Sequence, residues 1–140
     1  MMRGYSRGQI SIELMVTLGI ALLLFIFLID AAINQTSLAK DLTIRSNAKE
    51  VVSYVAESID DVYLGGNNAT KIITLPYALR GEIEYNIRVY PRSVLLTYNL
   101  NGQRHASQSI LAKNINGTEY YVLPKTAVRI RNHGGGVYFE

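Results

Sequence analysis

The segment Leu14–Ile29, which reads LMVTLGIALLLFIFLI, decides the fold of this 140-residue chain. It contains no charged residue, and only one threonine and one glycine interrupt its apolar character. Extended outward to residues 9–33, the stretch has about the length that a helix needs to cross the hydrocarbon core of a bilayer. Glu13 and Asp30 lie near its two ends. The sequence therefore predicts a membrane-spanning helix close to the N-terminus.

A secretory signal peptide is the main alternative for such a segment, with Arg3 and Arg7 as its basic start. Its apolar region would be shorter, however, and a small-residue cleavage site would follow it. Ala31–Ile33 does not supply a good site of this kind. Neither proline nor glycine occurs between Gly19 and Gly65, so we expect the helix to continue beyond the apolar segment.

Apolar residues in the next part of the chain follow the spacing of one helix face. They recur at intervals of four, three, four and three residues: Ala48, Val52, Val55, Ile59 and Val62. This pattern predicts an amphipathic helix that ends at Gly65–Gly66. We therefore expect one helix over residues 9–63, about 80 Å long, which is apolar over 9–33 and amphipathic over 34–63.

After Gly66 the periodicity changes toward two, which is typical of strands. The predicted strands are Lys71–Leu75, Gly81–Tyr90, Ser93–Leu100, Gln103–Leu111, Tyr120–Leu123, Val128–Arg131 and Val137–Phe139. Asn101–Gly102 indicates a two-residue hairpin, and Asn116–Gly117 a second turn. Residues 64–140 are therefore expected to form a small antiparallel β-sheet head domain.

One strand of this head domain alternates clearly, with Ile83, Tyr85, Ile87 and Val89 on one face. The amphipathic half of the helix is the expected cover for that apolar face. The predicted fold class is thus α+β, with a long N-terminal helix packed on an antiparallel sheet. Tyr85 and Tyr90 suit half-buried positions in the sheet.

Composition excludes several classes of function. The absence of cysteine excludes disulfides, thiolate zinc sites, iron–sulfur clusters and thiol catalysis. The net charge is +3, but without Arg3 and Arg7 only 12 basic residues face 11 acidic ones. Such a balance does not indicate a nucleic-acid partner.

No catalytic pattern stands out, so we expect no enzyme activity, no cofactor and no metal. His105 and His133 lie in polar stretches typical of turns and lack a suitable partner, which favours surface histidines. Gly134–Gly136 has no phosphate-binding lysine after it, which favours a tight turn or bulge. Asp60–Asp61 resembles a solvated helix end more than a cation site.

The residues Arg7-Gly8-Gln9-Ile10-Ser11-Ile12-Glu13 resemble the class III signal peptide of archaeal type IV pilins. In that family a peptidase cuts after a basic-Gly pair and leaves Gln-x-Ser-x-Glu at the new N-terminus. By this resemblance residues 1–8 are the signal peptide, and the cut between Gly8 and Gln9 makes Glu13 the fifth mature residue. The family often has leucine where this chain has Thr17. The resemblance covers roughly the first 25 residues.

The resemblance implies a structural subunit of a surface filament, polymerised through the apolar helix and used for adhesion. Its partners would be copies of itself, a class III prepilin peptidase, and an assembly ATPase with its membrane platform. The acid at Glu13 would pair with the new α-amino group of Gln9 on a neighbouring subunit. Two alternatives remain open: a minor or pseudopilin-like subunit, and a single-pass anchored extracellular binding domain that never polymerises.

Two further expectations concern the outside of the cell. Arg3 and Arg7 precede the apolar helix, which favours a cytoplasmic N-terminus and an external head. Asn34, Asn68 and Asn116 each begin an Asn-x-Ser/Thr triplet. If an oligosaccharyltransferase modifies the chain, we expect glycans on Asn68 and Asn116, which lie in predicted turns, and not readily on Asn34 in the helix.

Overall fold

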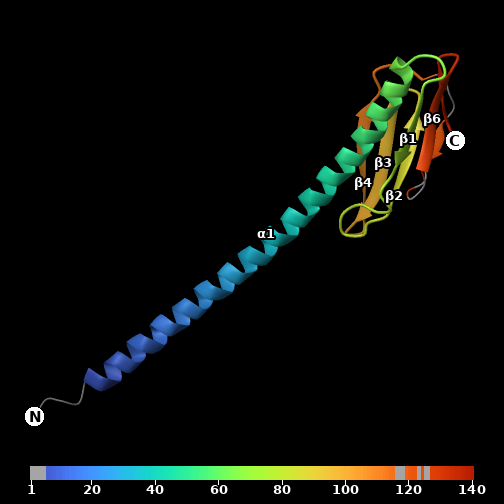
Figure 1. Ribbon diagram of the computed structural model, residues 1–140. Coiled ribbons are helices and arrows are strands. Elements are labelled where there is room, and N and C mark those ends of the chain that lie inside the picture. The colour runs from blue at the N-terminus through green and yellow to red at the C-terminus, as the bar shows by residue number, and fades with distance from the viewer. Residues whose placement is uncertain (1–5, 116–118, 123, 125–126) are drawn as a thin grey trace, which may run out of the picture. The chain divides into compact units, whose positions relative to one another are not determined.

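The computed structural model describes residues 6–115, 119–122, 124 and 127–140, with side chains from residue 11 onward (Figure 1). The chain divides into two compact units, Met1–Lys40 and Asp41–Glu140. The helix α1 (Ser6–Leu64) has 59 residues and runs through the boundary between them. Its unbroken length follows from the absence of proline and from strong apolar content. The predicted α+β class, a long helix with antiparallel strands, is confirmed.

The end of α1 is fixed by backbone geometry and by a side chain from a distant strand. The amide of Gly65 donates to the carbonyl oxygen of Asp61 at 2.9 Å, and Gly66 adopts a positive φ of 80°. The side-chain amide of Asn132 donates to the carbonyl oxygens of Val62 and Tyr63 at 3.3 and 3.2 Å. The last carbonyls of a helix lack partners within it, so Asn132 caps them, together with the Gly66 amide, which donates to the Tyr63 carbonyl at 3.3 Å.

The strands in the described part of the chain form two antiparallel sheets. A three-stranded sheet has the order β1-β6-β7, from β1 (Thr70–Thr74), β6 (Ala127–His133) and β7 (Gly136–Phe139). A four-stranded sheet has the order β4-β3-β2-β5, from β2 (Tyr85–Tyr90), β3 (Ser93–Leu100), β4 (Gln103–Ile110) and β5 (Tyr120–Val122). We expected antiparallel strands in one sheet, but the antiparallel strands form two sheets. The sequence did not indicate this division, because alternation within a strand does not show which strands pair.

The other correction concerns the start of the alternating strand. We expected it to begin at Gly81, but β2 begins at Tyr85. Gly81 and Glu82 have φ values of 83° and 60°, and Leu79 pairs with Ile83 in an isolated bridge. The backbone therefore turns through this segment, because left-handed φ values are incompatible with an extended strand.

The hairpin turns agree with the glycine signals. Asn101 and Gly102 join β3 to β4 with φ values of 52° and 76°. Gly134 and Gly135, with φ values of 61° and 83°, join β6 to β7, so the tight turn is confirmed. Two consecutive positive φ values are the requirement of a two-residue hairpin loop of type I′. The predicted turn at Asn116–Gly117 lies outside the described residues.

The core of the second unit lies between α1 and the two sheets, and Figure 1 shows the end of α1 lying along the strands. The predicted helix stripe is buried, with no member more than 3% exposed: Ala48, Val52, Val55, Ile59 and Val62. Tyr85, Ile87 and Val89 are buried as well, which confirms the predicted apolar face of β2. Within the described residues, the core cluster begins at Ile44.

Candidate functional site

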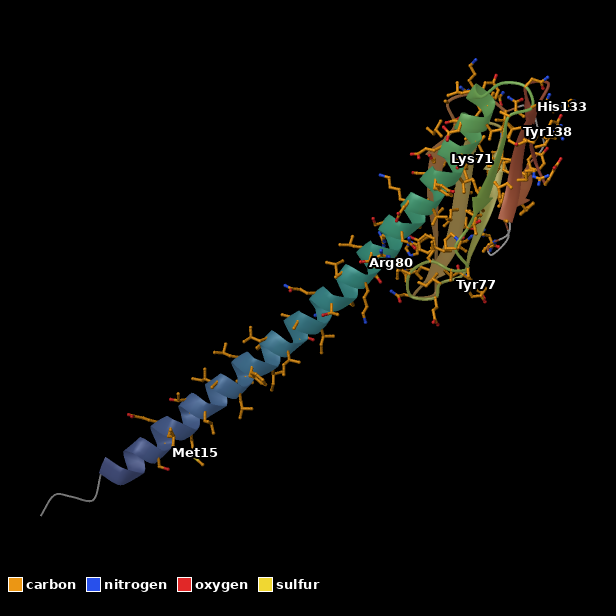
Figure 2. All side chains as sticks on the ribbon, viewed as in Figure 1. Met15, Lys71, Tyr77, Arg80, His133 and Tyr138 are labelled. Atoms are coloured by element: carbon orange, nitrogen blue, oxygen red, sulfur yellow. The ribbon has the colours of Figure 1, made fainter. Side chains whose placement is uncertain are left out.

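The first unit exposes an apolar helix surface, which is the most unusual feature of the chain. Every side chain described between residues 11 and 40 is exposed, and Figure 2 shows them extending from the helix around Met15. The large apolar side chains between Ile12 and Ile33 are 46% to 74% exposed. An 18-residue window of α1 has a mean hydropathy of 2.8 and no buried residue. By length and composition, this helix is able to cross a membrane.

The predicted cleavage and assembly residues lie at the start of α1. The backbone of Arg7, Gly8 and Gln9 belongs to the helix, and their side chains lie outside the described residues. Glu13 is exposed, and its backbone carbonyl accepts a hydrogen bond of 2.8 Å from Thr17 Oγ1. In the part of the chain with described side chains, the Glu13 carboxylate has no ion-pair partner. A charged acid beside an apolar surface is therefore available to a partner.

Polar side chains follow the apolar segment on the same helix. Asn34 Nδ2 donates to Asp30 Oδ2 at 3.3 Å, and Ser37 Oγ donates to the Asn34 carbonyl at 2.9 Å. Thr36 Oγ1 donates to the carbonyl oxygen of Ala32 at 2.9 Å. The triplet at Asn34 is thus helical, and its asparagine and threonine both engage neighbours one turn away.

The triplet at Asn68 has a different setting. Asn68 is exposed between α1 and β1, has a φ of 68°, and its amide donates to the carbonyl of Asn132 at 2.9 Å. Thr70, the third residue of the triplet, is exposed at the first position of β1. The predicted place of Asn68 in the helix-to-sheet connection is confirmed. Asn116 lies outside the described residues.

Both histidines lie in strands. His105 falls within the predicted strand Gln103–Leu111, whereas His133 was expected in a turn after the predicted strand Val128–Arg131. His105 belongs to β4 and stacks on Tyr98, with ring centroids 5.5 Å apart. His133 is the exposed last residue of β6. The strand β6 continues two residues beyond its predicted end at Arg131, because Asn132 and His133 are polar and do not extend the apolar alternation. No group of three or more potential metal ligands occurs among the described residues.

The two acids near the end of α1 hold the head together and are not merely solvated. Both carboxylate oxygens of Asp60 accept from the Ala112 amide, at 3.1 and 3.2 Å. Asp61 Oδ2 lies 2.7 Å from Lys71 Nζ in a partly exposed ion pair. The two acids thus have partners on β1 and in the segment after β4. The local sequence did not indicate these partners, because they are distant along the chain.

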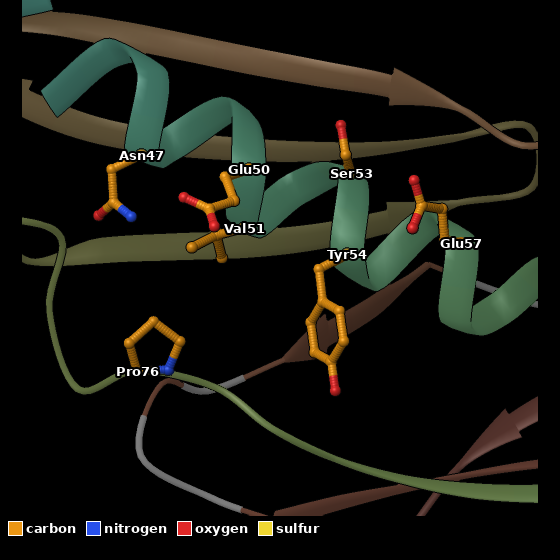
Figure 3. Close-up of a pocket in the computed structure, with 7 residues that line it drawn as sticks. All are labelled: Asn47, Glu50, Val51, Ser53, Tyr54, Glu57 and Pro76. Carbon is orange, nitrogen blue, oxygen red and sulfur yellow. The ribbon is translucent and has the colours of Figure 1, made fainter. Parts of the chain in front are cut away.

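The second unit also has a groove beside α1 that sequence reasoning missed. Its volume is about 450 Å³, and Figure 3 shows the residues that line it: Asn47, Glu50, Val51, Ser53, Tyr54, Glu57 and Pro76. Tyr54 is 42% exposed, with two acids one turn before and one turn after it. The spacing of Glu50, Tyr54 and Glu57 on one helix flank was the available signal.

Two polar aromatic contacts lie in the four-stranded sheet. Tyr85 donates a hydrogen bond of 2.5 Å to the carbonyl of Pro76, and burial raises the pKa of this tyrosine to about 12. Arg88 lies 4.8 Å from the ring centroid of Tyr121 and 3.7 Å from Glu119. The pKa of Arg88 is raised mainly by a side-chain hydrogen bond with Tyr90 and next by an electrostatic interaction with Tyr121. Tyr85 is fully buried, whereas the half-buried position expected for Tyr90 is confirmed.

The described residues form an exposed apolar helix that continues into a folded head. The comparisons do not identify a relative. No protein-family model matches the chain, and no match was found among curated proteins or solved structures.

Proposed function

We propose that this chain is a structural subunit of an archaeal type IV pilus-like surface filament. The observation that carries the proposal is the exposed apolar surface of α1 between residues 11 and 33. Burying Leu14–Ile29 removes on the order of 1,500 Å² from water, which corresponds to tens of kcal/mol before opposing costs. A bilayer provides this burial for a precursor, and helices of other copies provide it in a filament. The chain therefore moves from lipid to a bundle of its own copies.

Cleavage between Gly8 and Gln9 prepares the chain for this step. It removes the basic residues Arg3 and Arg7 while the apolar helix stays attached to the head. It also creates an α-amino group close to the apolar surface. That group pairs with the Glu13 carboxylate of a neighbouring copy, because an acid within an apolar bundle needs a counter-charge.

The other parts of the proposal follow from this pathway. The precursor lies in the cell membrane with a cytoplasmic N-terminus and an external head, since basic residues precede the apolar helix. A class III prepilin peptidase cuts it, and an assembly ATPase with a membrane platform protein polymerises it. The mature filament is extracellular and serves surface adhesion. Where the host has an oligosaccharyltransferase, Asn68 is the accessible glycosylation site among the described asparagines.

N-terminal sequencing of filaments sheared from the cell surface tests the proposal. The mature chain should begin at Gln9 and should be the main protein of the filament. A trace amount would indicate a minor or pseudopilin-like subunit, and an uncut chain confined to the membrane would indicate an anchored binding domain.

A matched pair of glycine variants sharpens the test. Gly8→Val should leave an uncut precursor, because a branched side chain replaces the small residue before the cut. Gly19→Ala should be cut normally, because it leaves the residues around the cut unchanged and a Cβ at Gly19 meets nothing within 4 Å in the single chain. Normal cleavage of the Gly8→Val precursor would contradict the proposed cleavage site.

A further inference from the structure

The outer face of the three-stranded sheet carries a row of basic side chains on β6. Along this strand the exposure alternates strictly, so that Arg129, Arg131 and His133 are exposed while Val128, Ile130 and Asn132 are buried. Alternate residues of a strand project from one face about 6.8 Å apart. The row therefore presents two permanent positive charges and a histidine along one line. We call this row the basic face.

The neighbours of the basic face come from β7 and the chain end. Tyr138, 44% exposed, pairs with Arg131, and Figure 2 shows it beside His133. Glu140 faces Arg129, and their backbones exchange two hydrogen bonds of 2.8 Å. Arg129 and Arg131 nevertheless form no ion pair with any described residue. Glu140 lines the same pocket as Arg131 and His133, so the face carries one acid beside its two unpaired guanidinium groups.

An acidic surface of matching kind lies in the groove beside α1. Glu50 and Glu57 are two helical turns apart, about 10.5 Å along the axis, and both are exposed. Neither acid forms an ion pair in the described part of the chain. The basic side chain of Lys71 pairs with Asp61 instead. Tyr54 lies between them in sequence and is 42% exposed, with Lys71 Nζ of the same molecule 6.0 Å from its ring centroid (Figure 3). Two carboxylates and an aromatic ring are the groups that bind guanidinium best.

The two surfaces lie on opposite sides of the three-stranded sheet. Lys71 and Ile73 of β1 face α1, since Lys71 pairs with Asp61 and Ile73 is fully buried. Ile72, between them, is 61% exposed on the opposite face, where its register partner is Arg129. One molecule therefore cannot satisfy its own basic face with its own groove.

We propose that the basic face of one copy docks into the acidic groove of a second copy. Arg129 and Arg131 bind Glu50 and Glu57. Because different surfaces meet, one copy of a docked pair keeps its groove free and the other keeps its basic face free, so the contact repeats without closing. This inference rests on the proposed filament and adds a contact between heads to the bundle of helices.

The contact determines how neighbouring heads are oriented more than it strengthens their binding to each other. Exposed ion pairs are individually weak, but long arginine side chains accommodate the difference between strand and helix spacing. Repetition along a filament makes many weak contacts act together. Opposite charges also favour one arrangement of neighbouring heads over others.

Cysteine cross-linking on the full chain in surface filaments tests the contact. The natural sequence has no cysteine, so a variant with Glu57→Cys and Arg131→Cys carries only the two introduced thiols. A short thiol-specific bismaleimide should convert this variant into a ladder of covalent oligomers. Each single variant should stay monomeric, because neither surface meets itself.

The matched control combines Glu57→Cys with Arg104→Cys, which lies on the exposed outer side of the four-stranded sheet. This pair should give no ladder. Filaments that form normally while the Glu57→Cys and Arg131→Cys pair stays monomeric would overturn the docking contact and leave the proposed filament standing. Absence of filaments from the unmodified chain would instead contradict the proposed function itself.

Charge exchange provides a second measurement. Glu50→Arg with Glu57→Arg, or Arg129→Glu with Arg131→Glu, should reduce sheared filament protein by about tenfold through like-charge contacts. The fourfold variant that combines both changes should restore it. If the Arg129→Glu and Arg131→Glu variant assembles normally but loses binding to dextran sulfate, the basic face belongs to an acidic polymer and the self-docking proposal fails.

Discussion

At the scale of single residues, Glu13 is the side chain on which the proposed assembly depends most. It lies exposed next to the apolar surface and has no ion-pair partner among the described side chains. Replacing it with an uncharged residue leaves the new amino group of a neighbour without its counter-charge. Breaking such a desolvated pair typically costs about 3–5 kcal/mol.

We therefore expect Glu13→Gln to give a precursor that is inserted and cut but poorly assembled. Immunoblots of membrane and sheared filament fractions measure the distribution. Glu84→Gln, an exposed acid in the head, should assemble normally. Normal filament yield from Glu13→Gln would show that this acid is only solvated.

Tyr85 makes the free energy of unfolding of the head depend on pH in the alkaline range. Burial raises its pKa from the ordinary value of 10.0 to about 12, so the folded chain keeps the phenolic proton more tightly than the unfolded chain. Its contribution is complete below pH 10 and is lost as the pH rises toward 12, with an upper value of about 2–3 kcal/mol.

Urea unfolding at several alkaline pH values, with wild type and Tyr85→Phe, measures this effect. The Tyr85→Phe chain should lose less stability than wild type between pH 10 and 12, because it lacks the titrating group. Tyr121→Phe, at a position 63% exposed, should behave like wild type. Equal pH dependence of wild type and Tyr85→Phe would contradict the assignment.

At the scale of elements, hydrophobic periodicity predicted what depends on neighbours in sequence. The helix stripe from Ala48 to Val62 and the two-residue turn at Asn101–Gly102 follow directly from spacing and from glycine. The pairing of β1 with β6 does not, because it joins segments more than 50 residues apart. Asn132 illustrates the same limit, since nothing around it in sequence indicates that its amide caps α1.

The candidate site divides in the same way. Residue pattern predicted the apolar surface and the place of Asn68, because both depend on local composition. The groove was missed because Pro76 reaches α1 only through the fold. The basic face was missed because the three basic residues of β6 mean little until the sheet shows which face is covered.

The buried stripe of α1 gives a direct test at this scale. Ile59 is fully buried, so Ile59→Ala should lower the free energy of unfolding of the head by about 2–4 kcal/mol through lost contacts and a cavity. Leu64→Ala, at the end of the same helix and 75% exposed, should change it by less than about 0.5 kcal/mol. Chemical denaturation of both variants provides the comparison. Similar losses at the two positions would show that α1 does not pack as described.

At the scale of the whole molecule, the two units have opposite relations to water. The core residues in the described part of the chain all lie in Asp41–Glu140, whereas the side chains described in Met1–Lys40 are exposed. The head therefore does not need the first unit for its core. The first unit, in contrast, has an apolar surface that no described residue covers.

This separation predicts that a fragment of residues 41–140 is soluble and folds by itself. The fragment keeps the stripe of α1, both sheets and the Asn132 contacts, so its core is complete. Circular dichroism should show cooperative thermal unfolding, and size-exclusion chromatography should show a monomer, because one weak head contact does not sustain association without the helix bundle. The full chain should require detergent or a filament under the same conditions. A fragment that is unfolded or insoluble would mean that residues before Asp41 contribute to the folding of the head.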